Sequence, residues 1–209
     1  MGLTIHYTFA ELSRVGSRAR RRVEELREHA ATLPFKLVGQ VLEADQAQIK
    51  NAPRDDPRCW LFTQSTRYVE RGGFHRAVKP IHLIAFSTSP GTGSEEANFG
   101  LAHYPARIKF DGRTVHTGLP GWSWSSFCKT QYAAAPDVGG AANFLKCHLA
   151  IVSLLDFADT LGILREVHDE GEYGDKRDLA ALAIQVASPH APVSSFDQGG
   201  PDAWLVTRG

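Results

Sequence analysis

The sequence is poor in cysteine and has no excess of charge of either sign. Its cysteines, Cys59, Cys128 and Cys147, are too few for a disulfide framework and leave an odd thiol, so we expect all of them to be reduced. Lysine plus arginine and aspartate plus glutamate number 23 each, which gives a formal net charge of zero. Because no overall positive field attracts a polyanion, nucleic acid is disfavoured as a partner.

Long apolar runs and strong catalytic motifs are also lacking. The longest apolar run, 149–155, is far shorter than the roughly 20 residues that a membrane helix needs. No apolar segment follows a basic one at the N-terminus, so we expect a cytoplasmic protein without a membrane partner. There is no Walker loop, paired CxxC, HExxH or GxSxG motif, and the sequence therefore indicates neither a reaction nor a cofactor.

The composition is nevertheless that of a folded domain. The 209 residues are 43% apolar, 22% charged and 10% aromatic, which excludes a disordered or fibrous chain. We find no internal repeat, low-complexity tract or convincing linker. The sequence thus predicts a single α+β domain over residues 1–187. A tail over 188–209 contains proline and glycine, and only its segment 203–206 is expected to dock on the domain.

Hydrophobic periodicity predicts the elements of the first two thirds of the chain. A strand at 3–9 is followed by an amphipathic helix whose apolar residues recur at steps of three and four from Leu12 to Leu33. The segment 81–86 is apolar on both faces, so we expect it at the centre of the sheet. Further strands are expected at 36–43 and 59–64, with a polar loop at 45–57 between them, and an antiparallel meander is expected from strands at 98–103, 108–110, 114–117 and 122–132.

Two helices are predicted in the last third. The first spans about 141–161 and ends before Gly162, and a strand at 165–169 follows it. Asp175 and Asp178 resemble a capping box that opens the second helix. The overall prediction is a mostly antiparallel sheet with an N-terminal helix and two C-terminal helices packed on it. The last helix is expected to bury Leu179, Leu182, Ala183 and Val186.

The loop that follows the central strand is the first candidate ligand site. Ligands commonly bind where loops leave the ends of strands, and this loop offers backbone amides, hydroxyls and carboxylates. Its two glutamates would repel a phosphate, and a plain connection between strands is the alternative interpretation. The residues expected to bind a ligand are Ser87, Thr88, Gly91, Gly93 and Glu95.

The strand at 122–132 is the second candidate. Period-two alternation places Trp122, Trp124, Cys128 and Tyr132 on one side, together with Ser126 and Thr130. Aromatic rings and hydroxyls on one face suit a binding platform. The alternative is sheet core, with Cys128 as a small buried hydrophobic residue.

Cysteine chemistry would need partners for Cys128. A nucleophilic thiolate requires a base, and His148 falls on the inward stripe of the long helix, where it could meet Cys128. Asp169, in an acidic cluster after the next strand, could orient the imidazole or help hold a divalent cation. The alternatives are a satisfied core histidine and a solvated acidic turn. The histidines show no short ligand spacing with one another, so we predict no metal site.

Four segments resemble those of an uncharacterised group of bacterial proteins that has no assigned activity. They are FSTSPGTGSEEANFGL (86–101), WSSFCKTQYA (124–133), NFLKCHL (143–149) and VHDEGEY (167–173). This resemblance spans most of the chain and implies a bacterial origin and one soluble domain, but it transfers no catalytic residue. The order of elements from 122 onward also resembles the cofactor-binding half of acyl-CoA-dependent N-acetyltransferases, with Gly139 and Ala141 in the turn and Pro136 departing from the family pattern.

Two classes of function remain open. The favoured one is a small-molecule enzyme or ligand-binding domain with a pocket near Cys128 and His148. The other is a non-catalytic domain that binds a protein partner through exposed aromatic residues. An acetyltransferase-like protein is a remote third possibility.

Overall fold

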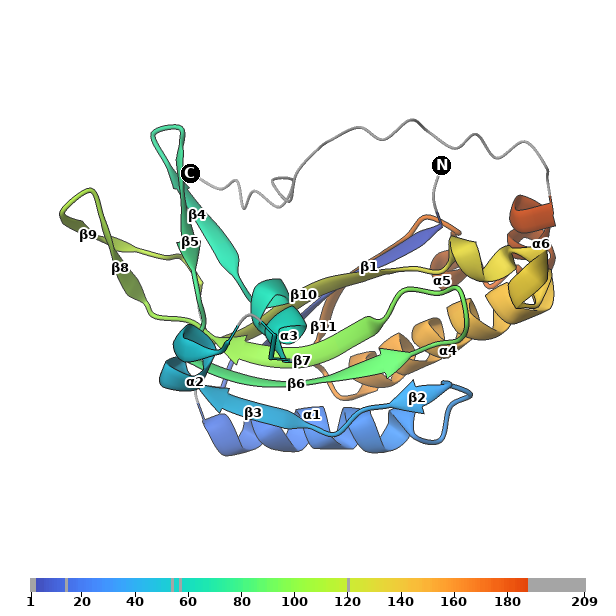
Figure 1. Cartoon of the computed structure of the whole chain (residues 1–209), viewed down its shortest axis with the longest axis horizontal. Coiled ribbons are helices and arrows are strands. Elements are labelled where there is room, and N and C mark those ends of the chain that lie inside the picture. Colours follow the sequence, from blue (N-terminus) through green and yellow to red (C-terminus); the bar gives the residue numbers. More distant parts are fainter. Residues whose placement is uncertain (1–2, 14, 54, 57, 120, 188–209) are drawn as a thin grey trace.

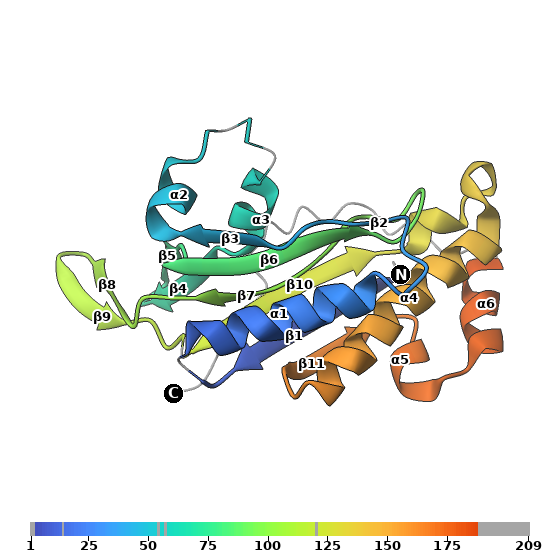
Figure 2. The same ribbon diagram turned by 90° about the horizontal axis from the view of Figure 1, so that it is seen from below.

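The fold is built on one main antiparallel sheet, and two long helices cover one face of this sheet (Figures 1 and 2). The computed structural model describes residues 3–13, 15–53, 55–56, 58–119 and 121–187. About 37% of the chain is helix and 34% is strand, in a single domain, so the predicted α+β class is confirmed. The predicted tail over 188–209, including 203–206, lies outside the described residues.

The main sheet has the strand order β11-β1-β10-β7-β6-β2, and β3 also pairs with β6. Every pair is antiparallel. The strand predicted at the centre, β6, lies near one edge of the sheet. Only the short strands β2 and β3 lie beyond it, and each pairs with part of its length. The strands are β1 (Thr4–Glu11), β2 (Leu37–Val38), β3 (Leu42–Asp45), β6 (His82–Ser89), β7 (Ala97–His103), β10 (Trp122–Lys129) and β11 (Leu164–Asp169).

Helices α1 (Gly16–Ala30) and α4 (Gly140–Thr160) lie side by side on the covered face (Figure 2). The buried residues of α1 are Ala19, Val23, Leu26 and Ala30, at the predicted steps of three and four. By length and composition alone, α4 could cross a membrane, although the short apolar runs of the sequence did not indicate such a helix. Half of its most apolar stretch is buried inside the fold. Gly162, at φ 72°, follows its end.

Two short helices replace elements that we predicted differently. The polar loop at 45–57 contains α2 (Gln46–Asn51), because Asp45 accepts a hydrogen bond from Gln48 N and the Gln48 side chain accepts one from Asp45 N. The strand predicted at 59–64 is wrong, since these residues form α3 (Cys59–Gln64). Six residues with adjacent apolar side chains cannot distinguish the two periods, and here Leu61 and Phe62 are buried by one helical turn.

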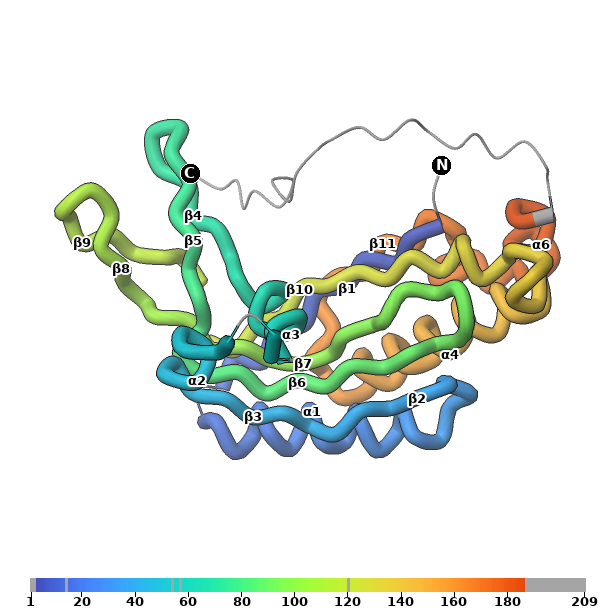
Figure 3. Tube along the Cα trace, in the orientation of Figure 1, coloured from blue at the N-terminus to red at the C-terminus, as the bar shows by residue number. Residues whose placement is uncertain are grey.

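Two hairpins project from the same end of the molecule (Figures 1 and 3). The first, β4 (Arg67–Arg71) and β5 (Phe74–Val78), lies in a segment for which we made no prediction. Gly72 and Gly73 both have positive φ, as a type I′ turn requires. The second hairpin, β8 (Arg107–Phe110) and β9 (Arg113–His116), corrects the predicted meander, because β7 pairs directly with β10.

The C-terminal part of the described chain is also more divided than predicted. Two 3-10 turns, η1 (Gln131–Ala134) and η2 (Pro136–Val138), end the predicted strand at Lys129 and precede α4. Two short helices follow β11, α5 (Tyr173–Lys176) and α6 (Leu179–Ala187). Asp178 alone caps α6, by accepting a hydrogen bond from Ala181 N, and Leu182 is buried while Leu179 is 45% exposed.

The core lies between the sheet and the two long helices. The register pairs Ile5 with Cys128 and Phe9 with Trp124, so these four side chains share the covered face. The alternation predicted from Trp122 to Cys128 is confirmed, because every second residue of β10 is buried. Tyr132 departs from the pattern and is 56% exposed, since it lies in η1.

Candidate functional site

The sheet opens between β7 and β10. These strands pair at Trp122 with His103 and at Ser123 with Ala102, and contact resumes at Lys129, whose carbonyl accepts a hydrogen bond from Glu95 N. Between these two points side chains replace the ladder. We call this interval, from Ser123 to Lys129 on β10 and from Glu95 to Ala102 on the β7 side, the open seam.

Large side chains from the covered face reach into the open seam. Trp124 Nε1 and Tyr7 OH each donate to the Asn98 carbonyl, at 2.8 Å. At the far end, Cys128 Sγ donates to the Glu95 carbonyl, at 3.2 Å. Because these donors occupy backbone acceptors, the two strands cannot close the ladder here.

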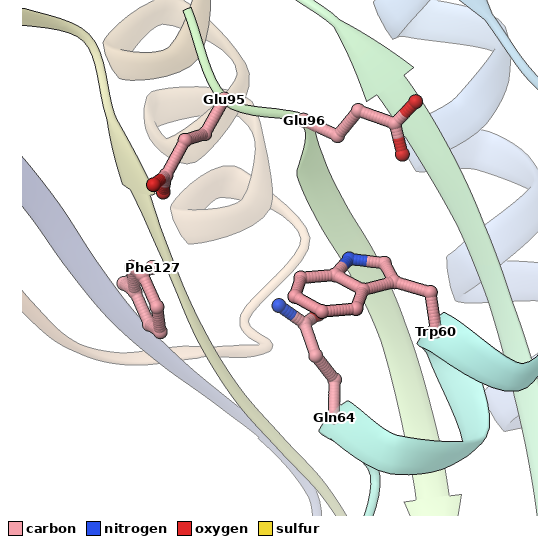
Figure 4. A pocket seen from close by; sticks show the side chains of 5 residues that line it. All are labelled: Trp60, Gln64, Glu95, Glu96 and Phe127. Carbon is pink, nitrogen blue, oxygen red and sulfur yellow. The ribbon is translucent and has the colours of Figure 1, made fainter. Parts of the chain in front are cut away.

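A pocket of about 320 Å³ lies over the open seam, on the face opposite α1 and α4 (Figure 4). Helix α3 forms one wall and is held to β10 by a hydrogen bond from Ser126 Oγ to Gln64 Oε1, at 3.2 Å. The pocket is lined by Trp60, Gln64, Glu95, Glu96 and Phe127.

The pocket combines two carboxylates with two aromatic rings. The Glu95 side chain turns toward the side of Phe127, whereas Glu96 lies on the side of the Trp60 indole (Figure 4). Glu95 Oε2 accepts a hydrogen bond from Lys129 N, at 3.3 Å, which fixes its place beside β10. Trp60 is 54% exposed, unusually high for the largest side chain, so its ring is free to contact a ligand.

Asn98 adds an unsatisfied amide at the same seam. Its side chain is fully buried, and neither Nδ2 nor Oδ1 has a hydrogen-bond partner among the described residues. Leaving a buried polar group unpaired costs about 1–3 kcal/mol. Asn98 follows Glu96 by two positions, so in an extended chain both side chains leave on the same face. Asn98 is not among the residues that line the pocket, and both amide atoms are buried, so this unpaired amide belongs to the interior of the fold and not to the pocket lining.

His148 and Asp169 meet, as the sequence hypothesis required of its base and orienting group. His148 Nε2 lies 3.1 Å from Asp169 Oδ2, and both side chains are buried. Asp169 also accepts hydrogen bonds from Gly171 N and Gly174 N. Burial alone would raise the pKa of Asp169, but the hydrogen bond and charge of His148, together with the backbone hydrogen bonds from Gly174 and Gly171, outweigh it and hold the pKa below its usual value.

Cys128 does not join this pair. The other ring nitrogen of His148, Nδ1, lies 3.0 Å from Thr130 Oγ1, so both nitrogens are occupied. Burial raises the pKa of Cys128 to about 12, whereas a nucleophilic thiolate needs a lowered value. Ser94, whose Oγ lies 3.6 Å from Cys128 Sγ, only partly offsets this rise. The geometry therefore does not supply the activation that the nucleophile hypothesis required.

The other residues proposed from the sequence are distributed around the sheet. Of the eight expected to bind a ligand, Glu95 lines the pocket. Trp122 and Trp124 are buried in the core, and Thr88 donates to the Ala97 carbonyl. Tyr132 is exposed beyond the strand end.

The glycines and Ser87 of the 87–96 loop have backbone or packing roles. Ser87 is half-buried on β6. A Cβ at Gly91 would lie 2.6 Å from Cys147 Sγ. Gly93 has φ 83°, and a Cβ there would lie 2.7 Å from the Tyr132 carbonyl. These positions serve the close packing of the loop against η1 and α4.

Sequence reasoning missed four of the five pocket residues. Trp60 and Gln64 were assigned to a strand, and Phe127 was on the opposite face of β10 from the one we expected to bind. Glu96 lay in the predicted loop site but was not selected. An exposed tryptophan one helical turn from a glutamine was the available signal, but it depended on recognising α3 as a helix.

Comparisons with models of protein families, with curated proteins and with solved structures give no match. The resemblance to a bacterial group therefore stays a prediction. In the described part of the chain, no three His, Cys, Asp or Glu side chains are grouped as metal ligands would be. Any function must be argued from the pocket and its surroundings.

Proposed function

We propose that this protein is a ligand-binding domain whose pocket over the open seam takes a small organic cation. The observation that supports this proposal most directly is that two carboxylates, Glu95 and Glu96, line the same pocket as the rings of Trp60 and Phe127. Carboxylates attract a cation by charge, and aromatic faces attract it through their quadrupole, most strongly for tryptophan. A pocket near Cys128 was expected from the sequence. In this proposal the Cys128 thiol does not contact the ligand, and it only donates a hydrogen bond to the Glu95 carbonyl.

The size and polarity of the pocket support the same class of ligand. About 320 Å³ lies at the lower end of the range for small-molecule sites. Gln64 provides a neutral hydrogen-bonding group beside the carboxylates. An ammonium or guanidinium group with a short apolar or hydroxylated body suits this lining, whereas a phosphate or carboxylate would meet like charge.

Calorimetric titration with choline, agmatine and 3,3-dimethyl-1-butanol tests the proposal. The last compound is the uncharged carbon isostere of choline, so it isolates the effect of charge. We expect saturable binding of at least one cation and no binding of the isostere. Equal binding of choline and its isostere, or no saturable binding of either cation, would contradict the proposal.

Two variants test which residues hold the cation. Glu96→Gln removes one charge at constant shape, and Trp60→Ala removes the exposed ring. Each should weaken binding by about tenfold, equivalent to about 1.4 kcal/mol. Glu28→Gln, an exposed carboxylate on α1, and Tyr68→Ala, an exposed ring on β4, are matched controls that should leave binding unchanged.

A further inference from the structure

The two projecting hairpins carry an uncompensated positive charge. Together with Lys79, which follows β5, they hold seven lysines and arginines against two acids. The chain as a whole has a formal net charge of zero, so the positive charge of the hairpins is balanced by a net negative charge on the rest of the chain. The cations are Arg67, Arg71, Arg76, Lys79, Arg107, Lys109 and Arg113, and the acids are Glu70 and Asp111.

Ion pairing separates these cations from the other arginine cluster of the chain. On α1, Arg18, Arg20, Arg21 and Arg22 each pair with a glutamate. In the part of the chain that the structure describes, no ion pair involves a hairpin cation. The charge of α1 is therefore neutralised locally, whereas that of the hairpins is available to a partner.

The register of the first hairpin sorts its charges by face. Arg71 is opposite Phe74, and Arg76 is opposite Val69, so both arginines share one face with the exposed Phe74 ring. Arg67 shares this face, but its guanidinium is already bound to the carbonyls of Gln64, Thr66 and Ser125. Glu70 lies on the other face.

The second hairpin has a similar division. Arg107 and Lys109 share an exposed face with His116 and Thr114, while Phe110 and Val115 are buried on the other face. Arg113 is exposed near the turn, but it is opposite Phe110 and so lies on the other face from Arg107 and Lys109. Both hairpins thus present cations on two-stranded ribbons that extend from the body at one end (Figures 1 and 3).

We propose that the two hairpins form a binding surface for the phosphate backbone of a nucleic acid duplex. Guanidinium groups match phosphate oxygens in a bidentate way, and unpaired arginines supply the available charge on the first hairpin. A two-stranded ribbon has the width to enter the major groove. An isolated ribbon exposed on most of both faces is also marginally stable by itself, which favours a partner that covers it. This surface is distinct from the pocket and does not depend on its ligand.

Fluorescence anisotropy with a labelled 20-base-pair DNA duplex of mixed sequence tests the proposal. The full chain is titrated at 50, 100 and 200 mM KCl. Five phosphate contacts would weaken binding by roughly 10² to 10³-fold over this range, because each contributes about 0.9 to the logarithmic salt slope. No binding at 50 mM KCl would overturn the proposal, and so would tighter binding of the single strand than of the duplex.

Paired substitutions locate the surface. Arg71→Ala with Arg76→Ala, and Arg107→Ala with Lys109→Ala, should each weaken duplex binding at least tenfold at 100 mM KCl. Each should also lower the magnitude of the salt slope by about 1.8, for two lost contacts. Arg20→Ala with Arg21→Ala removes two exposed but paired cations and should change neither quantity.

Further measurements separate the competing outcomes. Because the substituted side chains are exposed, thermal unfolding should confirm that every variant remains folded. Equal weakening by the α1 control would show that general charge, not the hairpins, binds the duplex. Binding to vesicles with 30% phosphatidylserine at protein concentrations that leave the duplex free would assign the surface to a membrane instead. The Glu96→Gln variant should keep its duplex affinity, which separates this surface from the pocket.

Discussion

At the residue scale, His148 illustrates how one buried imidazole can join several elements. Its two nitrogens connect α4 to Thr130 after β10 and to Asp169 at the end of β11. Thr130 Oγ1 also donates to the Leu3 carbonyl, next to β1. Every polar atom of the ring is satisfied, so this arrangement stabilises the fold in the way that buried polar networks do when all their members are paired.

Substitution of His148 by alanine should cost about 3–5 kcal/mol of unfolding free energy, because it leaves Asp169 buried without its partner. Urea unfolding measures this. Asp156→Ala, which removes the exposed ion pair with Arg177, is the control and should cost less than about 1 kcal/mol. A loss for His148→Ala no larger than that of the control would contradict the structural role.

The same pair predicts a dependence of stability on pH. The pKa of Asp169 is lower in the folded protein than in the unfolded chain, where it is about 4. The unfolded chain therefore binds the proton more readily, so this stabilisation is fully present above about pH 4 and is lost as the pH falls through the folded value. Urea unfolding between pH 6 and pH 3 should show a smaller acid-induced loss in Asp169→Asn than in the unmodified protein.

Cys128 should be unreactive in the folded protein, because burial raises its pKa to about 12. Alkylation with iodoacetamide at pH 8, followed by peptide mass spectrometry, should modify the half-buried Cys59 first and Cys128 only after denaturant is added. The experiment includes Cys128→Ser to confirm the assignment of peptides. Rapid alkylation of Cys128 near neutral pH would revive the nucleophile hypothesis.

At the element scale, close approach between β6 and β7 holds the intact side of the open seam. A Cβ at Gly100 would lie 2.6 Å from the Ile84 carbonyl and 2.5 Å from the Ala85 Cβ. Real side chains do not come this close, so only glycine permits the spacing. The continuous ladder from His82 to Thr88 along β7 depends on this contact, and it sets a firm edge beside the region where β10 departs.

Gly100→Ala should therefore destabilise the protein by about 1–3 kcal/mol through overpacking against backbone. Thermal unfolding measures the change. Gly16→Ala is the matched control, because a Cβ at the start of α1 would lie 3.4 Å from the Trp122 ring, an ordinary contact. The control should be neutral or slightly stabilising. Equal stability of both variants would show that the sheet adjusts freely at Gly100.

At the scale of the whole molecule, the fold separates a rigid body from two exposed ribbons. Strands β1, β7 and β10 lie beneath α1 and α4, and their inward side chains are almost fully buried. The β4–β5 hairpin has one buried residue, Val78, among its ten. A net charge of zero concealed this division, since the hairpin cations and the acids elsewhere cancel in the sum.

Hydrogen exchange should reveal this division directly. Backbone amides of β1 and β10 should exchange orders of magnitude more slowly than those of β4 and β5, because opening a ribbon exposes little apolar surface. Added duplex should slow exchange in both hairpins and leave the strands of the main sheet unchanged. Equal protection of the hairpins and the main sheet in the free protein would contradict the proposed division.

Several features were determined by the sequence alone. The α+β class, both long helices and the alternation from Trp122 to Cys128 were predicted correctly, because helical and strand periods remain clear over long segments. The secondary structure of short segments was predicted less well. Residues 59–64 form a helix and 45–57 contains one, because in six residues packing and capping decide between periods that the pattern does not resolve.

Only the tertiary structure decided the site. The pocket requires α3 to lie over an interval where Trp124 and Tyr7 occupy the backbone acceptor of Asn98, and no local pattern specifies that long-range contact. The same is true of charge. The sequence already places glutamates one helical turn from Arg20, Arg21 and Arg22, but whether the hairpin cations have an acidic partner depends on distances between side chains in space, which only the fold sets.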